Sequence, residues 1–211
     1  MTEHRKTITT ISWCPFNNDL FVSGSMDPKI CVWNVKTQNL VASFAHGRAI
    51  PAAIRWHPKK KSTIGYICGR GPMQLLDIDS DAKSEPIAGT MFLSDVSHFC
   101  WNYQHGSKLA FGHVDGTISI LWTGEKMDRH CLKPEHDETI TEDAPVIGLK
   151  WDELSSDYLL VANLNFGIRL IDTENMFIIM KFQLPSAATR VSSISWIPSA
   201  PGMFVTGGRC W

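Results

Sequence analysis

The stretch ISWCPFNNDLFVSGSMDPKICVWN, residues 11 to 34, contains two tryptophans twenty positions apart, Trp13 and Trp33. Apolar and polar residues alternate as the chain approaches Trp13, and such alternation is typical of a strand with one buried face. A second apolar run ends in the small residues SGS, which permit a tight turn. A third run, ICVWN, closes the stretch at Trp33. The stretch therefore predicts three consecutive β-strands.

The same arrangement returns along the chain at intervals of 43, 45, 50 and 45 residues. In each unit an anchor tryptophan ends a first strand, a second run follows, and a third strand ends about twenty residues after the anchor in the four units that reach it. Self-similarity at such a period is the signature of a repeat architecture. The anchors are Trp13, Trp56, Trp101, Trp151 and Trp196.

A fourth, outer strand is predicted after the third strand of each complete unit. The runs LVASF, at 40 to 44, and FIIMKF, at 177 to 182, have the required apolar character, and weaker candidates occur around 86 to 88 and 129 to 132. The fifth unit reaches Trp211 before a third strand begins. We therefore expect four complete units and the first two strands of a fifth.

The composition of the 211 residues fits a globular protein, since 44% are hydrophobic and 19% are charged. The net charge of −1 gives no broad attraction to nucleic acid or to an anionic membrane. The N-terminal residues MTEHRKTITT lack the apolar core of a signal peptide, and no apolar run reaches the length of a membrane span. The six cysteines include no CxxC pair. We expect reduced, mostly buried cysteines and an intracellular, cytoplasmic location.

The repeat resembles the WD40 repeat, which builds β-propellers of four-stranded blades. The resemblance rests on the period, on Trp-x-Pro at Trp13, Trp56 and Trp196, on the SGS turn, and on the Trp33-Asn34 close. It implies an all-β WD40 β-propeller of about four blades plus the first two strands of a fifth, forming an incomplete, open ring. The expected blades are about 4 to 44, 46 to 90, 92 to 134 and 142 to 184, with a partial blade at about 187 to 211.

A closer resemblance, to one long multi-repeat member of the family, runs along nearly the whole chain. It is carried by TITTISWCPFNNDLFVSGS, GHVDGTISI, DYLLVANLNFGIRL and LPSAATRVSSISWIPSAPGMFVTG. Because that member is much longer, the resemblance implies that this chain is a fragment or splice form of a larger protein, with exposed strand edges at its C-terminal end.

The WD40 resemblance also implies a structural hydrogen-bond network in the first blade. His4, Ser23, Asp27 and Trp33 occupy the positions whose side chains link the turn and strands of one blade. Asp115 matches the aspartate position in the third unit. Other units depart from the pattern: Arg70 and Asn165 stand where an Asp is expected, and only His46 repeats the role of His4.

In the family, one face of the propeller commonly receives a peptide or a partner domain. This face gathers the loops between second and third strands and those leading into first strands. Exposed arginines and aromatic residues are frequent energetic anchors of interfaces, although the same residues also serve as ordinary turn residues. The candidate partner-binding residues are Met26, Lys29, Arg48, Arg70, His113, Asn165 and Phe166.

Other chemistry finds little support in the sequence. The lysines of HPKKKS, at 57 to 62, lack interleaved aromatic residues and are expected to form a solvated surface, so nucleic acid is disfavoured as a partner. His130, Cys131 and His136 match no established zinc spacing, and the acidic insertion at 135 to 143 is expected to lengthen the third unit. No catalytic or phosphate-binding motif occurs. We expect no catalytic residues, no metal, no cofactor and no small-molecule substrate.

The expected function is that of a non-catalytic scaffold that binds protein or peptide partners. The alternative is a purely structural segment that completes a larger propeller and has no binding role of its own. Clustering of exposed arginine and aromatic side chains on the loop face would favour the scaffold.

Overall fold

The computed structural model describes residues 3–80, 84–123, 128–132, 145–164, 167–183 and 190–209. Within these ranges all regular secondary structure is β-strand, and no helix there could cross a membrane. The chain divides into two compact units, Met1–Val96 and Ser97–Trp211. The predicted insertion at 135 to 143 lies outside the described residues, as do His136, Asn165 and Phe166.

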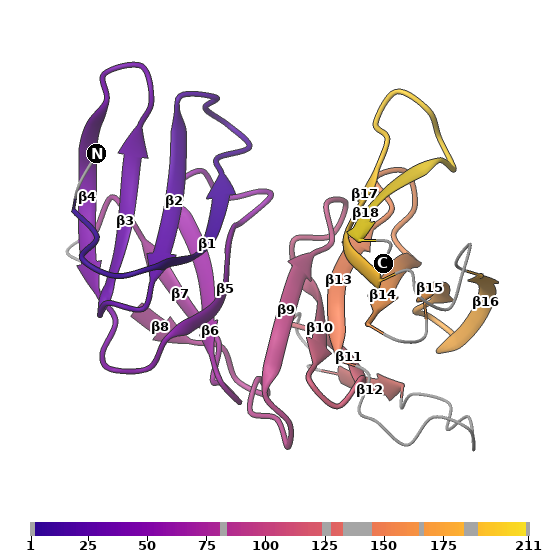
Figure 1. The fold of residues 1–211 in the computed structure, drawn as a ribbon. Coiled ribbons are helices and arrows are strands. Elements are labelled where there is room, and N and C mark those ends of the chain that lie inside the picture. Colours follow the sequence, from indigo (N-terminus) through magenta and orange to yellow (C-terminus); the bar gives the residue numbers. More distant parts are fainter. Residues whose placement is uncertain are drawn as a thin grey trace. The chain divides into compact units, whose positions relative to one another are not determined.

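The first unit consists of two antiparallel four-stranded sheets, in which consecutive strands are neighbours (Figure 1). The first sheet, blade 1, contains β1 (Ile8–Trp13), β2 (Leu20–Ser25), β3 (Lys29–Asn34) and β4 (Asn39–Ala45). The second sheet, blade 2, contains β5 (Pro51–Trp56), β6 (Thr63–Cys68), β7 (Gln74–Asp77) and β8 (Ser84–Pro86).

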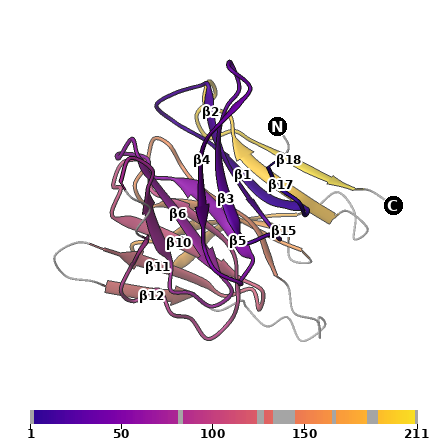
Figure 2. The same cartoon turned by 90° about the vertical axis from the view of Figure 1, so that its left-hand side faces the viewer.

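The second unit repeats this arrangement twice and adds a strand pair. Blade 3 contains β9 (Val96–Trp101), β10 (Lys108–His113), β11 (Ile118–Trp122) and β12 (Asp128–Leu132). Blade 4 contains β13 (Val146–Trp151), β14 (Tyr158–Asn163), β15 (Gly167–Asp172) and β16 (Phe177–Phe182). The remaining strands, β17 (Arg190–Trp196) and β18 (Phe204–Arg209), form a two-stranded sheet, the half-blade (Figure 2).

The strand register explains the twenty-residue spacing of the sequence. Phe21 pairs with Trp13 on one side and with Trp33 on the other, so both tryptophans lie in one row across the sheet. The same row joins Trp56 to Leu76 in blade 2 through Ile64. The spacing is therefore the chain length needed to pass through two successive hairpins and return to the same row.

Each unit buries apolar residues between successive sheets. In the first unit, Ile54 of β5 is fully buried and lies over Gly24 of β2, where an added Cβ would be 2.5 Å from the Ile54 Cδ1 atom. In the second unit, Val146 and Leu149 of β13 pack against Gly112 of β10, and Val146 makes the closer approach. Glycine is needed at these two positions because the next sheet approaches the backbone closely.

The sequence prediction of an all-β fold with four four-stranded sheets and a two-stranded one is confirmed. The incomplete, open form of the ring stays a prediction. The five cysteines in the described ranges are free, as expected, but fewer of them are buried than predicted. Cys14 and Cys31 are buried, whereas Cys131 is exposed because it lies on the outer strand β12.

Candidate interaction face

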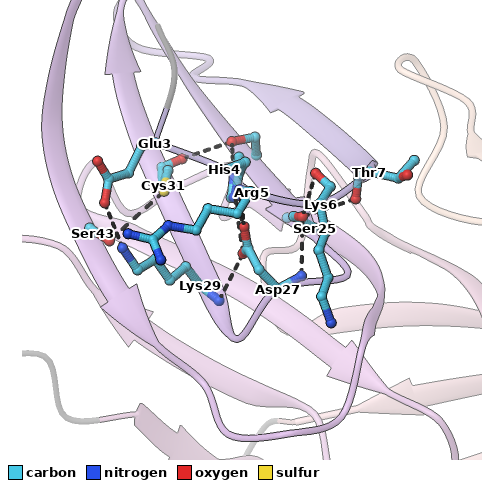
Figure 3. A network of polar contacts seen from close by, with 12 residues as sticks. Glu3, His4, Arg5, Lys6, Thr7, Ser25, Asp27, Lys29, Cys31 and Ser43 are labelled. Atoms are coloured by element: carbon cyan, nitrogen blue, oxygen red, sulfur yellow. Dashed lines mark hydrogen bonds and ion pairs between the residues drawn. The ribbon is translucent and has the colours of Figure 1, made fainter.

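Blade 1 contains a buried polar network that ties the N-terminal segment to the turn between β2 and β3. Nε2 of His4 lies 2.7 Å from the Ser23 hydroxyl, and its Nδ1 lies 3.0 Å from the Asp27 carboxylate (Figure 3). The Trp33 indole donates to the same hydroxyl at 2.8 Å. The structure therefore brings together the four residues that the sequence predicts for this network.

The network holds the Asp27 carboxylate in its charged form. Burial alone would raise the pKa of Asp27, but hydrogen bonds from the Arg5 backbone amide and from His4 bring it below its usual value. Asp27 also accepts from the backbone amide of Lys29 at 3.2 Å, which fixes the turn.

Serine, histidine and aspartate are the residue types of a nucleophilic triad, but their setting here differs from one. The Ser23 side chain is fully buried, and its hydroxyl is shared with the Trp33 indole. A nucleophile needs a position beside its hydroxyl where a reacting atom can sit. This arrangement fixes strand ends instead of presenting a reactive group.

Blades 3 and 4 use different polar pairs near the end of the second strand. His113 accepts or donates at Nε2 with the Ser119 hydroxyl at 2.9 Å, and Arg169 donates to the Asn163 side chain at 2.5 Å. Asp115 keeps only the turn contact, accepting from the Thr117 amide at 3.0 Å. The His113–Ser119 and Asn163–Arg169 pairs were not predicted, because each joins residues six apart across a hairpin.

The structure corrects two predictions made from the sequence. His113 is only 2% exposed, so it lies inside blade 3 and not on a partner-binding face. His46 does not repeat the role of His4: its ring nitrogens are buried and have no hydrogen-bond partner among the described residues. Tyr66 occupies the row of Ser23 in blade 2 and meets the His46 ring edge-on at 6.0 Å between centroids.

Burial has an electrostatic consequence for His46. Loss of solvent lowers the pKa of His46, and the nearby backbone and charge of Asp27 oppose this effect only in part. The neutral imidazole is therefore favoured in the folded chain.

The loops at one end of both sheets in the first unit form what we call the loop face, residues 3–7, 26–28, 46–50, 69–73 and 87–95. Backbone hydrogen bonds join neighbouring loops, as from Met26 to Thr7 and from Phe92 to Arg70. These bonds give the face a fixed backbone, which lowers the entropic cost of binding a partner.

The predicted contact residues of the first unit differ in their availability on this face. Met26 is 46% exposed, and Arg48 and Arg70 are also exposed. Arg70 pairs with Asp95 at 3.3 Å, while Lys29 forms an ion pair with Glu3 at 2.5 Å. The arginines can therefore contribute charge at the rim of the face, where the exposed Arg70 pair costs little to rearrange.

The loop face also exposes apolar side chains that sequence reasoning missed. Leu93 is 93% exposed, Met91 is 59% exposed and Ile50 is 44% exposed. With Met26 they give this face four large apolar side chains in loops, a feature that marks interaction surfaces when the side chains are contiguous. The available signal was the run MFL, at 91 to 93, in a segment with no strand alternation.

The lysine run and the cysteine of the third unit were the other candidates considered from the sequence. The turn with Lys59 and Lys60 is at the opposite end of blade 2, where both backbone amides donate to the buried His57 ring. The Cys131 thiol lies 3.4 Å from the Ser119 hydroxyl. Within the described residues, no three histidine, cysteine or acidic side chains gather in a way that could hold a metal ion.

The chain is similar to several known proteins. No family model matches it. Methylosome protein WDR77 of Xenopus laevis is 23% identical over 122 residues, which cover 56% of this chain and 35% of that protein. Eukaryotic translation initiation factor 3 subunit I of Aspergillus niger is 24% identical over 221 residues, which cover 98% of this chain and 61% of that protein. The chain thus spans less than two thirds of the length of these relatives.

A solved structure shows the same fold. The crystal structure of the Myceliophteria thermophila Cps50 (Swd1) β-propeller domain matches 97% of this chain and 64% of that domain, with a TM-score of 0.75 and 15% identity. At that identity the likeness shows the architecture alone, which is that of a β-propeller.

Proposed function

We propose that this chain is a non-catalytic scaffold of the WD40 β-propeller family that binds a protein partner through the loop face. The WD-repeat relatives and the propeller structure support this family. WD-repeat propellers generally act as protein-interaction scaffolds. The observation that carries the proposal is the group of exposed apolar side chains on the loop face, accompanied by Arg48 and Arg70.

The chemistry of the face favours a peptide or protein with apolar anchors and acidic residues. Interfaces draw most of their affinity from a few buried apolar or arginine side chains, surrounded by a polar rim. Met91 and Leu93 would supply the apolar contacts, and Arg48 would meet an acidic group on the partner. Binding such a partner through the loop face requires no cofactor and no small-molecule substrate.

The proposal includes an origin for the chain. The long stretches quoted from the sequence resemble WD repeat-containing protein 17, a longer protein with many more repeats, and we infer that this chain corresponds to its early part. An intracellular location belongs to the same proposal. If the chain were only a structural segment of that larger propeller, its loop face would have no partner.

Position-resolved crosslinking distinguishes the scaffold from the structural segment. A photoreactive amino acid is placed at Met26, Met91 or Leu93 of the chain expressed in cells. The matched controls are Phe16 and Val35, which are 42% and 40% exposed in turns at the opposite end of blade 1.

We expect the three loop-face positions to crosslink to one shared protein and the two controls to leave it unlabelled. Equal labelling from both ends of the sheet, or the absence of a shared product, would contradict the proposal.

A further inference from the structure

Where two blades of one unit pack together, three residues in the first strand of the later blade contact the sheet of the earlier blade. Relative to the anchor tryptophan, they are the anchor itself, the residue two before it and the residue five before it. In blade 4 these residues are Trp151, Leu149 and Val146, with exposed fractions of 1%, 5% and 0%. Their common role is to bury an apolar row against the neighbouring sheet.

Blade 1 presents the same three positions to solvent. Trp13, Ile11 and Ile8 are 56%, 58% and 51% exposed. Their residue types and spacing match those of the buried rows, and within the described residues no sheet precedes β1. The β1 face, defined by these three residues, therefore has the side chains of a junction without the neighbouring sheet.

A recurring hydrogen bond shows what such a neighbour must offer to the tryptophan. Three anchor indoles donate to the carbonyl of the residue just before the preceding anchor. The bonds are Trp56 to Ser12 at 3.0 Å, Trp151 to Cys100 at 3.3 Å and Trp196 to Lys150 at 3.1 Å. The corresponding carbonyl in the half-blade is that of Ser195, next to Trp196.

A hydroxyl four residues before the anchor joins two sheets in a second recurring contact. The Ser97 hydroxyl lies 3.0 Å from the Gly112 carbonyl of its own blade and 2.6 Å from the Val146 carbonyl of the next. Thr9 makes the same two contacts, with Gly24 and with Pro51.

The half-blade contains the first part of this arrangement. The Ser192 hydroxyl, four residues before Trp196, donates to the Gly207 carbonyl of its own sheet at 3.1 Å. Thr9 and Ser97 occupy the same position in blades 1 and 3, and each reaches a carbonyl of the next sheet as well. The equivalent carbonyl in a sheet covering the half-blade would lie five residues before that sheet's anchor.

A glycine also lies on the side of the half-blade that a next sheet would contact. Gly207 is eleven residues after Trp196, as Gly24 is after Trp13 and Gly112 after Trp101. Gly24 admits Ile54 of the next sheet, and Gly112 admits Val146 and Leu149. Val205 is 53% exposed, although its counterpart Val22 in blade 1 is fully buried by the next sheet. At the hydroxyl and glycine positions, blade 2 carries Ala52 and Ile67, and blade 4 carries Ile147 and Ala162. The hydroxyl and the glycine therefore occur together only in blade 1, blade 3 and the half-blade.

We propose that the half-blade of one chain binds the β1 face of a second copy. The Trp13 indole donates to the Ser195 carbonyl, the Ser192 hydroxyl donates to the Ile8 carbonyl, and Ile11 packs over Gly207. A second copy is the occupant because the β1 face carries the donor, the acceptor and the apolar residue at the spacing that the half-blade requires. The two surfaces differ, so the contact is head-to-tail and leaves one of each surface available for further copies.

Light scattering after size-exclusion chromatography, over a range of loading concentrations, tests this association. The wild-type chain is expected to rise above its monomer mass of 23.6 kDa as concentration increases. Ile11→Asp and Gly207→Val each remove one surface and should weaken self-association about tenfold or more, because an unpaired buried carboxylate or a steric clash costs more than a tenfold change requires. Ser192→Ala provides a milder change on the half-blade.

Mixing the two variants gives the decisive result. The Ile11→Asp chain keeps an intact half-blade and the Gly207→Val chain keeps an intact β1 face, so each alone should be monomeric and the mixture should form a dimer that grows no further. Val41→Asp, at a 54% exposed position on β4, is the matched control and should associate like the wild type.

Three results would overturn the proposal. The first is a wild-type mass that stays monomeric at every concentration. The second is self-association that both surface variants leave unchanged. The third is a mixture of the two variants that remains monomeric while circular dichroism shows both to be folded.

Discussion

Lys108 provides the sharpest test of how the second unit is held together. Its ammonium is completely buried and contacts the Ser156 carbonyl at 3.0 Å and the Asp157 carboxylate at 3.2 Å. The same nitrogen lies 4.6 Å from the Trp122 ring centroid and 5.0 Å from that of Trp151. The perturbation is Asp157→Asn, which removes the negative charge and keeps a similar shape.

The expected magnitude follows from this geometry. At 3.2 Å and an effective dielectric constant of about 20, the attraction between the two charges is about 5 kcal/mol. Because the Asp157 side chain is 38% exposed and the amide oxygen of Asn can still accept, we discount this to a loss of about 2 kcal/mol in the free energy of unfolding. Lys108→Met should cost less, since Met fills the space between the tryptophan rings and leaves Asp157 partly solvated.

The assay is denaturant unfolding followed by tryptophan fluorescence, because Trp122 and Trp151 lie beside the changed group. A double-mutant cycle then isolates the pair: Asp157→Asn should cost about 2 kcal/mol in the wild-type chain and close to nothing in the Lys108→Met chain. A free energy of unfolding for Asp157→Asn within about 0.5 kcal/mol of the wild type, or an equal cost in both chains, would show that this ion pair does not stabilise the second unit.

Three further predictions concern the first unit. Because its pKa is lowered in the fold, Asp27 stabilises the folded chain above its usual pKa of about 4 and loses this effect as pH falls through the folded value; acid titrations of unfolding should show a shallower decline for Asp27→Asn. The lowered pKa of His46 acts at higher pH, since the unfolded chain gains a proton first as pH falls below about 6.5; His46→Phe should remove the loss of stability that begins there in the same titrations. Trp56→Ala should destabilise the chain by about 3–5 kcal/mol and Trp13→Ala by under about 1 kcal/mol in urea unfolding, because Trp56 is 4% exposed and Trp13 is 56% exposed; equal costs would contradict the packing described.

Strand positions were predictable from the sequence because they depend on local periodicity. Trp13 and Trp33 share one row through Phe21, so their spacing reports the hairpin directly. The network of His4 in blade 1 was also accessible, through the family resemblance, because its members recur at fixed positions within one repeat.

Burial that depends on a neighbouring sheet was not predictable in the same way. Trp13 and Trp56 share the Trp-x-Pro motif, yet only Trp56 has a preceding sheet packed on it. The burial of Lys108 depends on Asp157, which lies 49 residues further along the chain. Leu93 was missed because irregular loops have no periodicity that separates exposed from buried apolar residues.

Hydrogen exchange in the purified complex tests whether the chain binds its protein partner through the loop face. Partner binding is expected to slow amide exchange in residues 26–28, 46–50, 69–73 and 87–95. Exchange is expected to stay unchanged in the turns at the opposite end of blade 1, residues 14–19 and 35–38. Protection of those turns, with the loop face unaffected, would show that the partner binds elsewhere.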